Sequence, residues 1–111
     1  MLDKERIRMS VLIELYGCLL TERQLMIVHS SVDDDLSLAE ISELTGITRQ
    51  GVRDSIKKSE EELERYESSL GLYEKYLARQ SLAEEIIDSL PEQLPDSARE
   101  KIVSLLGAIC E

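Results

Sequence analysis

The feature that most constrains this fold is a pair of helix signals placed on either side of one glycine. Ser37 and Glu40 have the spacing of a capping box, in which each side chain satisfies the other residue's backbone amide. Gly46 stands where a helix can end in a left-handed turn residue, and Thr48 can cap a second helix directly after it. Two helices joined so closely form a helix-turn-helix, which we predict at about residues 37–58.

Apolar residues recur where the two helices of such a motif must pack on each other. We expect this contact to be made by Ile41, Leu44, Ile47, Val52 and Ile56. Ser42 is small and lies where the helices cross closely. Gly46 tolerates the positive φ that the tight turn needs. The packing pattern and the turn residue therefore agree with each other.

The outward side of the second helix is basic. Its candidate nucleic-acid-binding residues are Arg49, Gln50, Arg53, Lys57 and Lys58. Arginine can bond guanine and glutamine can bond adenine bidentately in the major groove, whereas lysine suits phosphate. From Gly46 to Lys58 there are four basic residues and one acidic residue, so this patch is net positive. We interpret it as a DNA-binding surface; the alternative is an exposed helix face that is merely solvated.

The remaining segments also carry helical periodicity, with no strand alternation, and we predict an all-α fold that forms a single domain over residues 1–111. The other predicted helices run over about 3–19, 21–31 and 81–109. Two further capping boxes open helices in these segments, Thr21 with Gln24 and Ser97 with Glu100.

The helix that begins at Arg49 carries a heptad seam. The seam consists of Val52, Ile56, Ser59, Leu63, Tyr66, Leu70, Tyr73 and Leu77. Gly71 lies off it, so we expect one long helix over about 49–78, with any bend at that glycine. The seam can pack on its own chain, including the last helix, or pair with a second copy. It carries more apolar surface than one short tail covers, so we favour a homodimer through the long helix.

The charge of the chain limits how it can meet nucleic acid or membrane. The formal net charge is -10, so the field of the whole protein repels phosphate and any nucleic-acid role depends on the local basic patch. Cys18 and Cys110 are far apart in sequence, and we see neither a secretory signal nor a long apolar run. We therefore expect a cytoplasmic protein with reduced thiols.

No residue pattern indicates catalysis, a metal or a cofactor. Asp33 and Asp35 alternate as in a calcium loop, but Leu44 stands where the loop needs its last acidic ligand. His29 is the one histidine, and a neighbouring serine in the sequence does not supply triad geometry. We expect a solvated acidic loop, an exposed helix histidine and a protein that is not an enzyme.

The motifs and their order resemble a known family. The segments that carry the likeness are Thr21-Glu-Arg-Gln24, Leu36-Ser-Leu-Ala-Glu-Ile41, Gly46-Ile-Thr-Arg-Gln-Gly-Val52 and Ile56. They resemble region 4 of bacterial sigma-70 factors. With the flanking helices, over about residues 5–77, the chain looks like the YlxM-type helix-turn-helix proteins. Gly51 departs from the alanine expected there.

The resemblance implies a small, cytosolic, all-helical protein without a wing, whose DNA binding follows from the fold. Genes of this type tend to lie beside those of the signal recognition particle, which implies a regulatory role in that pathway. Duplex DNA and signal recognition particle components are the partners to expect. The alternative is an acidic interaction module, using Glu60 to Glu64 to meet a basic protein of that particle without DNA.

Overall fold

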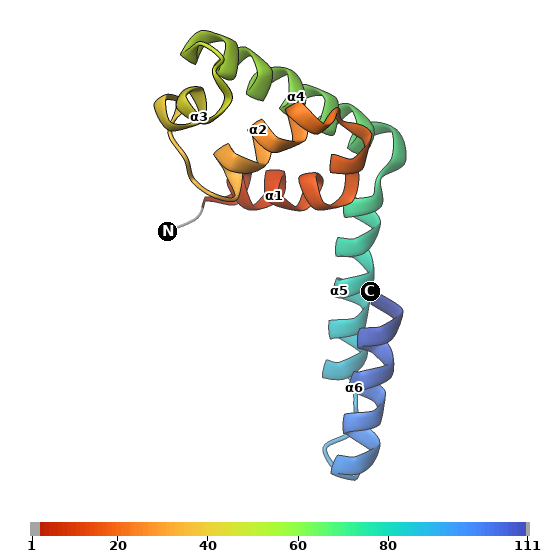
Figure 1. Cartoon of the computed structure of the whole chain (residues 1–111). Helices are drawn as coiled ribbons and strands as arrows, with labels where there is room; N and C mark the ends of the chain where they lie inside the picture. Colours follow the sequence, from red (N-terminus) through yellow and green to blue (C-terminus); the bar gives the residue numbers. More distant parts are fainter. Residues whose placement is uncertain (1–2, 111) are drawn as a thin grey trace. The chain divides into compact units, whose positions relative to one another are not determined.

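The computed structural model describes residues 3–110, and every regular element in that range is a helix, as predicted (Figure 1). In chain order the elements are α1 (Lys4–Tyr16), the 3-10 turn η1 (Gly17–Leu19), α2 (Glu22–Val32), α3 (Leu38–Thr45), α4 (Arg49–Leu70), α5 (Leu72–Asp88) and α6 (Asp96–Cys110). The chain divides after Gly71 into two compact units. Met1, Leu2 and Glu111, which the prediction of one domain over 1–111 included, lie outside the described residues.

Local signals set the starts of the helices in the first unit. Thr21 and Ser37 each form the complete capping box that the sequence predicted, and Thr48 accepts from the Gly51 amide at 3.0 Å. Asp3 caps α1 by accepting from the Arg6 amide at 2.7 Å. The first helix is shorter than predicted, because its last turn tightens into η1 instead of continuing to residue 19.

One face of α4 forms the centre of the first unit. Val52, Ser59 and Leu63 are fully buried, and α4 packs on α1, α2 and α3. The apolar residues that meet it include Leu12 and Ile27, also fully buried. This half of the heptad seam is therefore covered within its own chain, and the interpretation that it packs intramolecularly is correct for these residues.

The far end of α4 is fastened by a buried polar contact. The Tyr16 hydroxyl donates to Glu67 Oε1 at 2.7 Å, and both side chains are buried. The Tyr16 ring also lies against Tyr66, with 6.1 Å between ring centroids. Gly71, four residues after Glu67, adopts φ 63 and ends the helix. The predicted continuation of one helix to residue 78 is thus wrong, because a left-handed residue cannot propagate an α-helix.

The second unit is a helical hairpin, in which α6 returns antiparallel alongside α5 (Figure 1). The Cys110 thiol lies 3.7 Å from the Arg79 carbonyl oxygen, so the end of α6 lies level with the first half of α5. The predicted cap at Ser97 is wrong. Helix α6 already begins at Asp96, and the Arg99 amide donates to the Pro95 carbonyl, which makes Ser97 part of the first turn.

Several large apolar residues of this unit are exposed. They include Leu82, Ile86, Val103, Leu105 and Ile109. Two helices can cover only one strip of each other, so a pattern with apolar residues on more than one strip leaves some of them in water. No helix within residues 3–110 is long and apolar enough to cross a membrane.

Because the Tyr16–Glu67 hydrogen bond is buried, its loss should lower the stability of the fold substantially. We expect Tyr16→Phe to lower the free energy of unfolding by about 1.5–3 kcal/mol, since a buried carboxylate loses a donor. Urea unfolding followed by circular dichroism measures this. Glu67→Ala and the double variant complete the cycle, and the two single losses should exceed the double loss by at least about 0.5 kcal/mol. Additive losses would show that the hydrogen bond contributes nothing.

Candidate nucleic-acid interface

The turn between α3 and α4 is held by side-chain bonds as well as by its glycine. Gly46 adopts φ 74, where a residue with a Cβ is strained. The Ser42 hydroxyl donates to the Ile47 carbonyl, and the Thr45 hydroxyl donates to the Ile41 carbonyl at 2.8 Å. The sequence predicted Ser42 only as a small residue. Its bond to the turn was not predicted, because it joins positions whose geometry only the folded turn defines.

A small apolar cluster fixes the two helices of the motif on α2. Ile27, Ile41 and Val52 form its buried centre, and Leu36, Leu38, Ile47 and Ile56 pack around it. Four of the five predicted contact residues are therefore found in this cluster. Leu44 is the exception: it is 73% exposed, because it lies on the last turn of α3 beyond the reach of α4.

Gly51 has a steric role that its helix propensity does not reveal. A Cβ at this position would lie 2.7 Å from Ile47 Cγ2 and 3.2 Å from the Thr48 hydroxyl. The absence of a side chain lets Ile47 fold back over the first turn of α4 and reach the apolar cluster. The glycine that departs from the expected alanine therefore belongs to the packing of the turn.

Three of the predicted DNA-contacting side chains share one line along α4. Arg49, Arg53 and Lys57 are spaced four residues apart, which places them above one another on a helix, and all three are exposed. Gln50 lies beside this line, also exposed, and its amide donates to Asp54 Oδ1 at 2.9 Å. The helix dipole adds positive potential at the same end of the helix.

The structure does not bring Lys58 to this line. Consecutive residues on a helix point about 100° apart. Lys57 lines a hollow beside Arg6 and Arg8 of α1, whereas Lys58 lines a different hollow beside Thr21 and Gln24. Lys58 is exposed on the other flank of α4. Of the five predicted nucleic-acid-binding residues, four therefore lie together, as the basic line and the adjacent Gln50, and Lys58 lies apart from them.

The acidic residues that follow the basic line are divided in the same way. Glu60, Glu61 and Glu64 line the hollow of Lys57, and Glu62 lines that of Lys58. Residues 60–64 therefore do not form the single acidic face that the alternative interpretation required. Glu64 is engaged within the fold, since the Arg8 guanidinium donates to both of its oxygens at 3.0 and 2.8 Å.

These contacts shift two carboxyl pKa values in opposite directions. The Arg8 hydrogen bonds hold the pKa of Glu64 below its usual value. Burial raises the pKa of Glu60, and the neighbouring carboxylates of Glu5 and Glu64 raise it further. The charged form of Glu60 is therefore disfavoured in the fold, whereas that of Glu64 is favoured.

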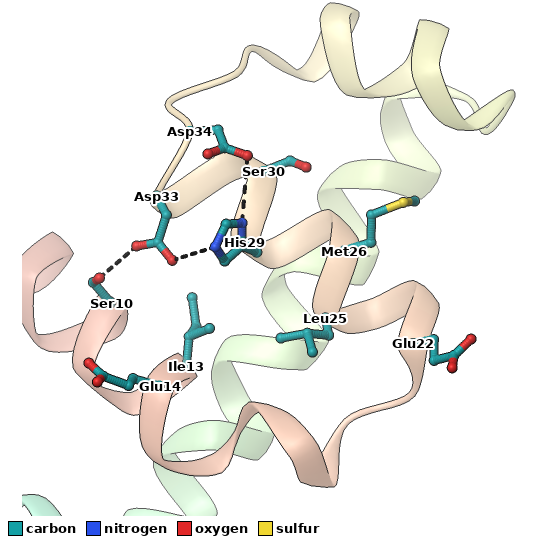
Figure 2. Close-up of a pocket in the computed structure, with 10 residues that line it drawn as sticks. All are labelled: Ser10, Ile13, Glu14, Glu22, Leu25, Met26, His29, Ser30, Asp33 and Asp34. Carbon is teal, nitrogen blue, oxygen red and sulfur yellow. Dashed lines mark hydrogen bonds and ion pairs between the residues drawn. The ribbon is translucent and has the colours of Figure 1, made fainter.

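A second hollow, between α1 and α2, has a different character (Figure 2). It measures about 780 Å³, and its apolar lining comes from Ile13, Leu25 and Met26. Four carboxylates stand around it: Glu14, Glu22, Asp33 and Asp34. The sequence did not predict this site, because its residues come from separate segments that only the packing of α1 on α2 brings together.

One histidine is held at the rim of this hollow. His29 lies between two carboxylates, with Nε2 3.3 Å from Asp33 and Nδ1 3.5 Å from Asp34 (Figure 2). The Ser10 hydroxyl donates to the other oxygen of Asp33 at 2.6 Å and ties the loop to α1. His29 is exposed on α2, as predicted. Within the described range no group of three or more metal-ligating side chains could hold an ion.

The capped helix pair, its glycine turn and the apolar cluster on α2 define a helix-turn-helix protein. Comparison with known families agrees: a family model described as "Putative helix-turn-helix protein, YlxM / p13 like" matches residues 3–103. The chain belongs to this family, UPF0122.

Curated relatives match over most of their length. A UPF0122 protein of Streptococcus gordonii is 40% identical over 102 residues, which cover 92% of this chain and 90% of the relative. One from Clostridium acetobutylicum is 44% identical over 87 residues, or 78% and 75% of the two chains. A third, from Streptococcus agalactiae, is 37% identical over 92% of this chain and 90% of its own.

The shifted carboxyl groups predict a pH-dependent stability difference. The folded state raises the pKa of Glu60, so its charged form opposes folding above that pKa. We expect Glu60→Gln to increase the free energy of unfolding at pH 7. The gain should fade as pH falls through the raised pKa of the folded state, and it should be absent below about 4, where the wild-type carboxyl is protonated in both states.

Glu64→Gln is the matched control with the opposite sign. Its charged form is favoured in the fold, so this variant should be less stable than wild type at pH 7, and the difference should shrink toward low pH. Urea midpoints at a series of pH values measure both. A Glu60→Gln protein that is less stable than wild type at pH 7 would contradict the electrostatic account.

Proposed function

We propose that this protein is a DNA-binding regulator that places the first half of α4 in the major groove. The observation that carries the proposal is the line of Arg49, Arg53 and Lys57 on a helix whose start is capped and packed. Arg49, Gln50 and Arg53 lie nearest the helix N-terminus, the end that recognition helices commonly direct at base edges. Lys57 lies one turn further, at a position suited to a phosphate.

The charge of the chain implies weak binding that depends strongly on salt. Only three cations lie on the line, and the net charge of the whole chain is -10. Each phosphate contact contributes to counterion release, so affinity should fall steeply between low and physiological salt. A regulator of this kind would distinguish DNA sequences through base contacts of the arginines and Gln50, not through general attraction to DNA.

Charge reversal on the two flanks of α4 tests the proposal. We expect Arg53→Glu to weaken binding to labelled duplex DNA by at least about tenfold at low salt, since an arginine contact is lost and a repulsion is added. Lys58→Glu makes the same charge change five residues on, away from the basic line, and should weaken binding less. Fluorescence anisotropy over a salt series measures both.

The salt series also distinguishes a specific contact from general charge. The slope of log affinity against log salt should become shallower by about one contact in Lys57→Gln, because Lys57 is the residue assigned to a phosphate. Equal losses in Arg53→Glu and Lys58→Glu would mean that only the net charge matters and would reject the assigned face. No binding of wild type to duplex DNA at low salt would reject the function.

A second function is favoured by the hollow between α1 and α2. We propose that it binds a basic amphipathic helix of a partner protein, with apolar side chains on Ile13, Leu25 and Met26 and cations on the surrounding carboxylates. Opposite charges would steer such a partner toward an acidic protein. The family resemblance makes a protein of the signal recognition particle the first partner to test.

Double Glu→Gln variants test whether this hollow, and not another acidic part of the chain, binds the partner. We expect Glu14→Gln with Glu22→Gln to weaken binding of a purified signal recognition particle protein at least about tenfold, as two charge pairs are lost. Glu61→Gln with Glu62→Gln changes the net charge equally and should have a smaller effect. Isothermal titration calorimetry at fixed salt measures the affinities of wild type and the two double variants. Equal losses in the two double variants would place the contact elsewhere.

A further inference from the structure

The second unit leaves much of its apolar surface in water. Within α5 and α6 the buried residues are Ala83 and Cys110, both small. By contrast, four large apolar residues are from 44% to 67% exposed: Leu82 (58%), Ile86 (44%), Leu105 (55%) and Ile109 (67%). A segment of about 40 residues rarely buries enough surface to be stable alone, and association is one way to complete it.

These four residues lie on one side of the hairpin. Half-buried Ile87 and Leu106 mark the strips on which α5 and α6 face each other, together with Ala83 and Cys110. Measured from the centre of each strip, Ile86 of α5 and Leu105 of α6 are both displaced by about a quarter turn in the same rotational sense. Because the helices are antiparallel, equal rotations point to the same side.

The opposite side is poorer in apolar residues. Val103 is displaced by about a sixth of a turn in the other sense, and Leu77 and Glu84 of α5 lie about a quarter turn toward that side. Val103 is 42% exposed. We call the side that carries Leu82, Ile86, Leu105 and Ile109 the apolar side of the hairpin.

The positions of these residues along the helix axes define the centre of the patch. Arg79 lies level with Cys110, where the thiol meets its carbonyl oxygen. Moving three residues along each antiparallel helix places Leu82 level with Gly107, midway between Leu105 and Ile109. The residues of the patch from the two helices therefore gather around the level of Leu82.

The charges of the hairpin are unevenly distributed along its length. Toward the loop that joins the two helices it carries six acidic residues, Glu84, Glu85, Asp88, Glu92, Asp96 and Glu100, against Arg99 and Lys101. Among the described residues, its other end carries Lys75 and Arg79 against Glu74, and Glu111 follows Cys110 in the sequence, so the formal charge of this end is close to zero. Two hairpins placed antiparallel would bring the acidic end of each beside the nearly neutral end of the other, whereas a parallel pair would bring the two acidic ends together.

We propose that the apolar side binds a second copy of this chain, with the two hairpins antiparallel and related by a two-fold axis at the level of Leu82. The four helices then form a bundle in which α5 faces its counterpart and α6 faces its counterpart. Residues 102–110 of α6 carry no charged side chain, as expected for a helix that is covered on more than one side. The predicted homodimer is thus proposed through the hairpin and not through the buried seam of α4.

Substitutions on the two sides of α6 test which surface is used. We expect wild type to sediment at twice its chain mass of 12.6 kDa at tens of micromolar. Leu105→Gln should raise the dimer Kd at least about tenfold, because each copy loses a buried leucine. Val103→Gln, on the opposite side, should leave the dimer intact. Circular dichroism checks that both variants remain helical.

Three results would overturn the proposal. They are a monomeric wild type at about 100 µM, dissociation by Val103→Gln but not by Leu105→Gln, or equal effects of the two variants. The measurement does not involve DNA or the first unit, so its failure is distinguishable from failure of the proposed DNA binding.

Single cysteines test the antiparallel arrangement without depending on stability. In a Cys18→Ser background, Leu82→Cys places the two new thiols at the same level, and mild oxidation should join the two chains. Ile86→Cys displaces each thiol by four residues in opposite directions, about 12 Å apart along the axis, which is too far for a disulfide. Equal crosslinking at both positions would contradict the antiparallel arrangement, and no crosslinking at either position would reject a two-fold axis at the level of Leu82.

Discussion

The structure of the first unit depends on the burial of one face of α4. Val52 and Leu63 are completely buried where α4 packs on α1, α2 and α3, and the same helix presents Arg49, Arg53 and Lys57 on another face. Since successive residues turn by about 100°, fixing the buried face also fixes where every basic side chain points. The buried Tyr16–Glu67 hydrogen bond holds the far end, and Thr48 and the Ile47 packing hold the near end. A helix fixed at both ends is a rigid element on which a binding surface can be built.

The sequence predicted those parts of the fold that are encoded within a few residues. The capping boxes at Thr21 and Ser37 and the glycine turn at Gly46 were confirmed, because a cap satisfies its own neighbours wherever the helix later packs. The cap at Ser97 failed because Pro95 starts the helix earlier. The seam past residue 70 failed for a related reason: periodicity reports an apolar strip but cannot report that Gly71 turns left-handed.

The candidate site was predictable as a list but not as a surface. Arg49, Gln50, Arg53 and Lys57 lie together as expected, whereas Lys58 follows Lys57 in sequence and still lies on the other flank. The acidic residues show the same effect. Glu64 is bound by Arg8, which lies 56 positions away, so its charge is partly compensated by a partner that no local pattern reveals. The hollow between α1 and α2 is the extreme case, as its lining residues belong to segments with no joint signal in the sequence.

Electrostatics links the proposed dimer to the proposed DNA binding. One copy offers three cations on its basic line against a net charge of -10, which leaves a monomer with little affinity for phosphate. A two-fold dimer would present two such lines, so that once one binds, the second acts at a high effective concentration and the affinities combine. The number of phosphate contacts would double, and so would the slope of the salt dependence. In this arrangement, association through the apolar side of the hairpin would provide the DNA affinity that a single acidic chain lacks. Two-fold symmetry in the protein would also favour two-fold symmetry in its DNA site.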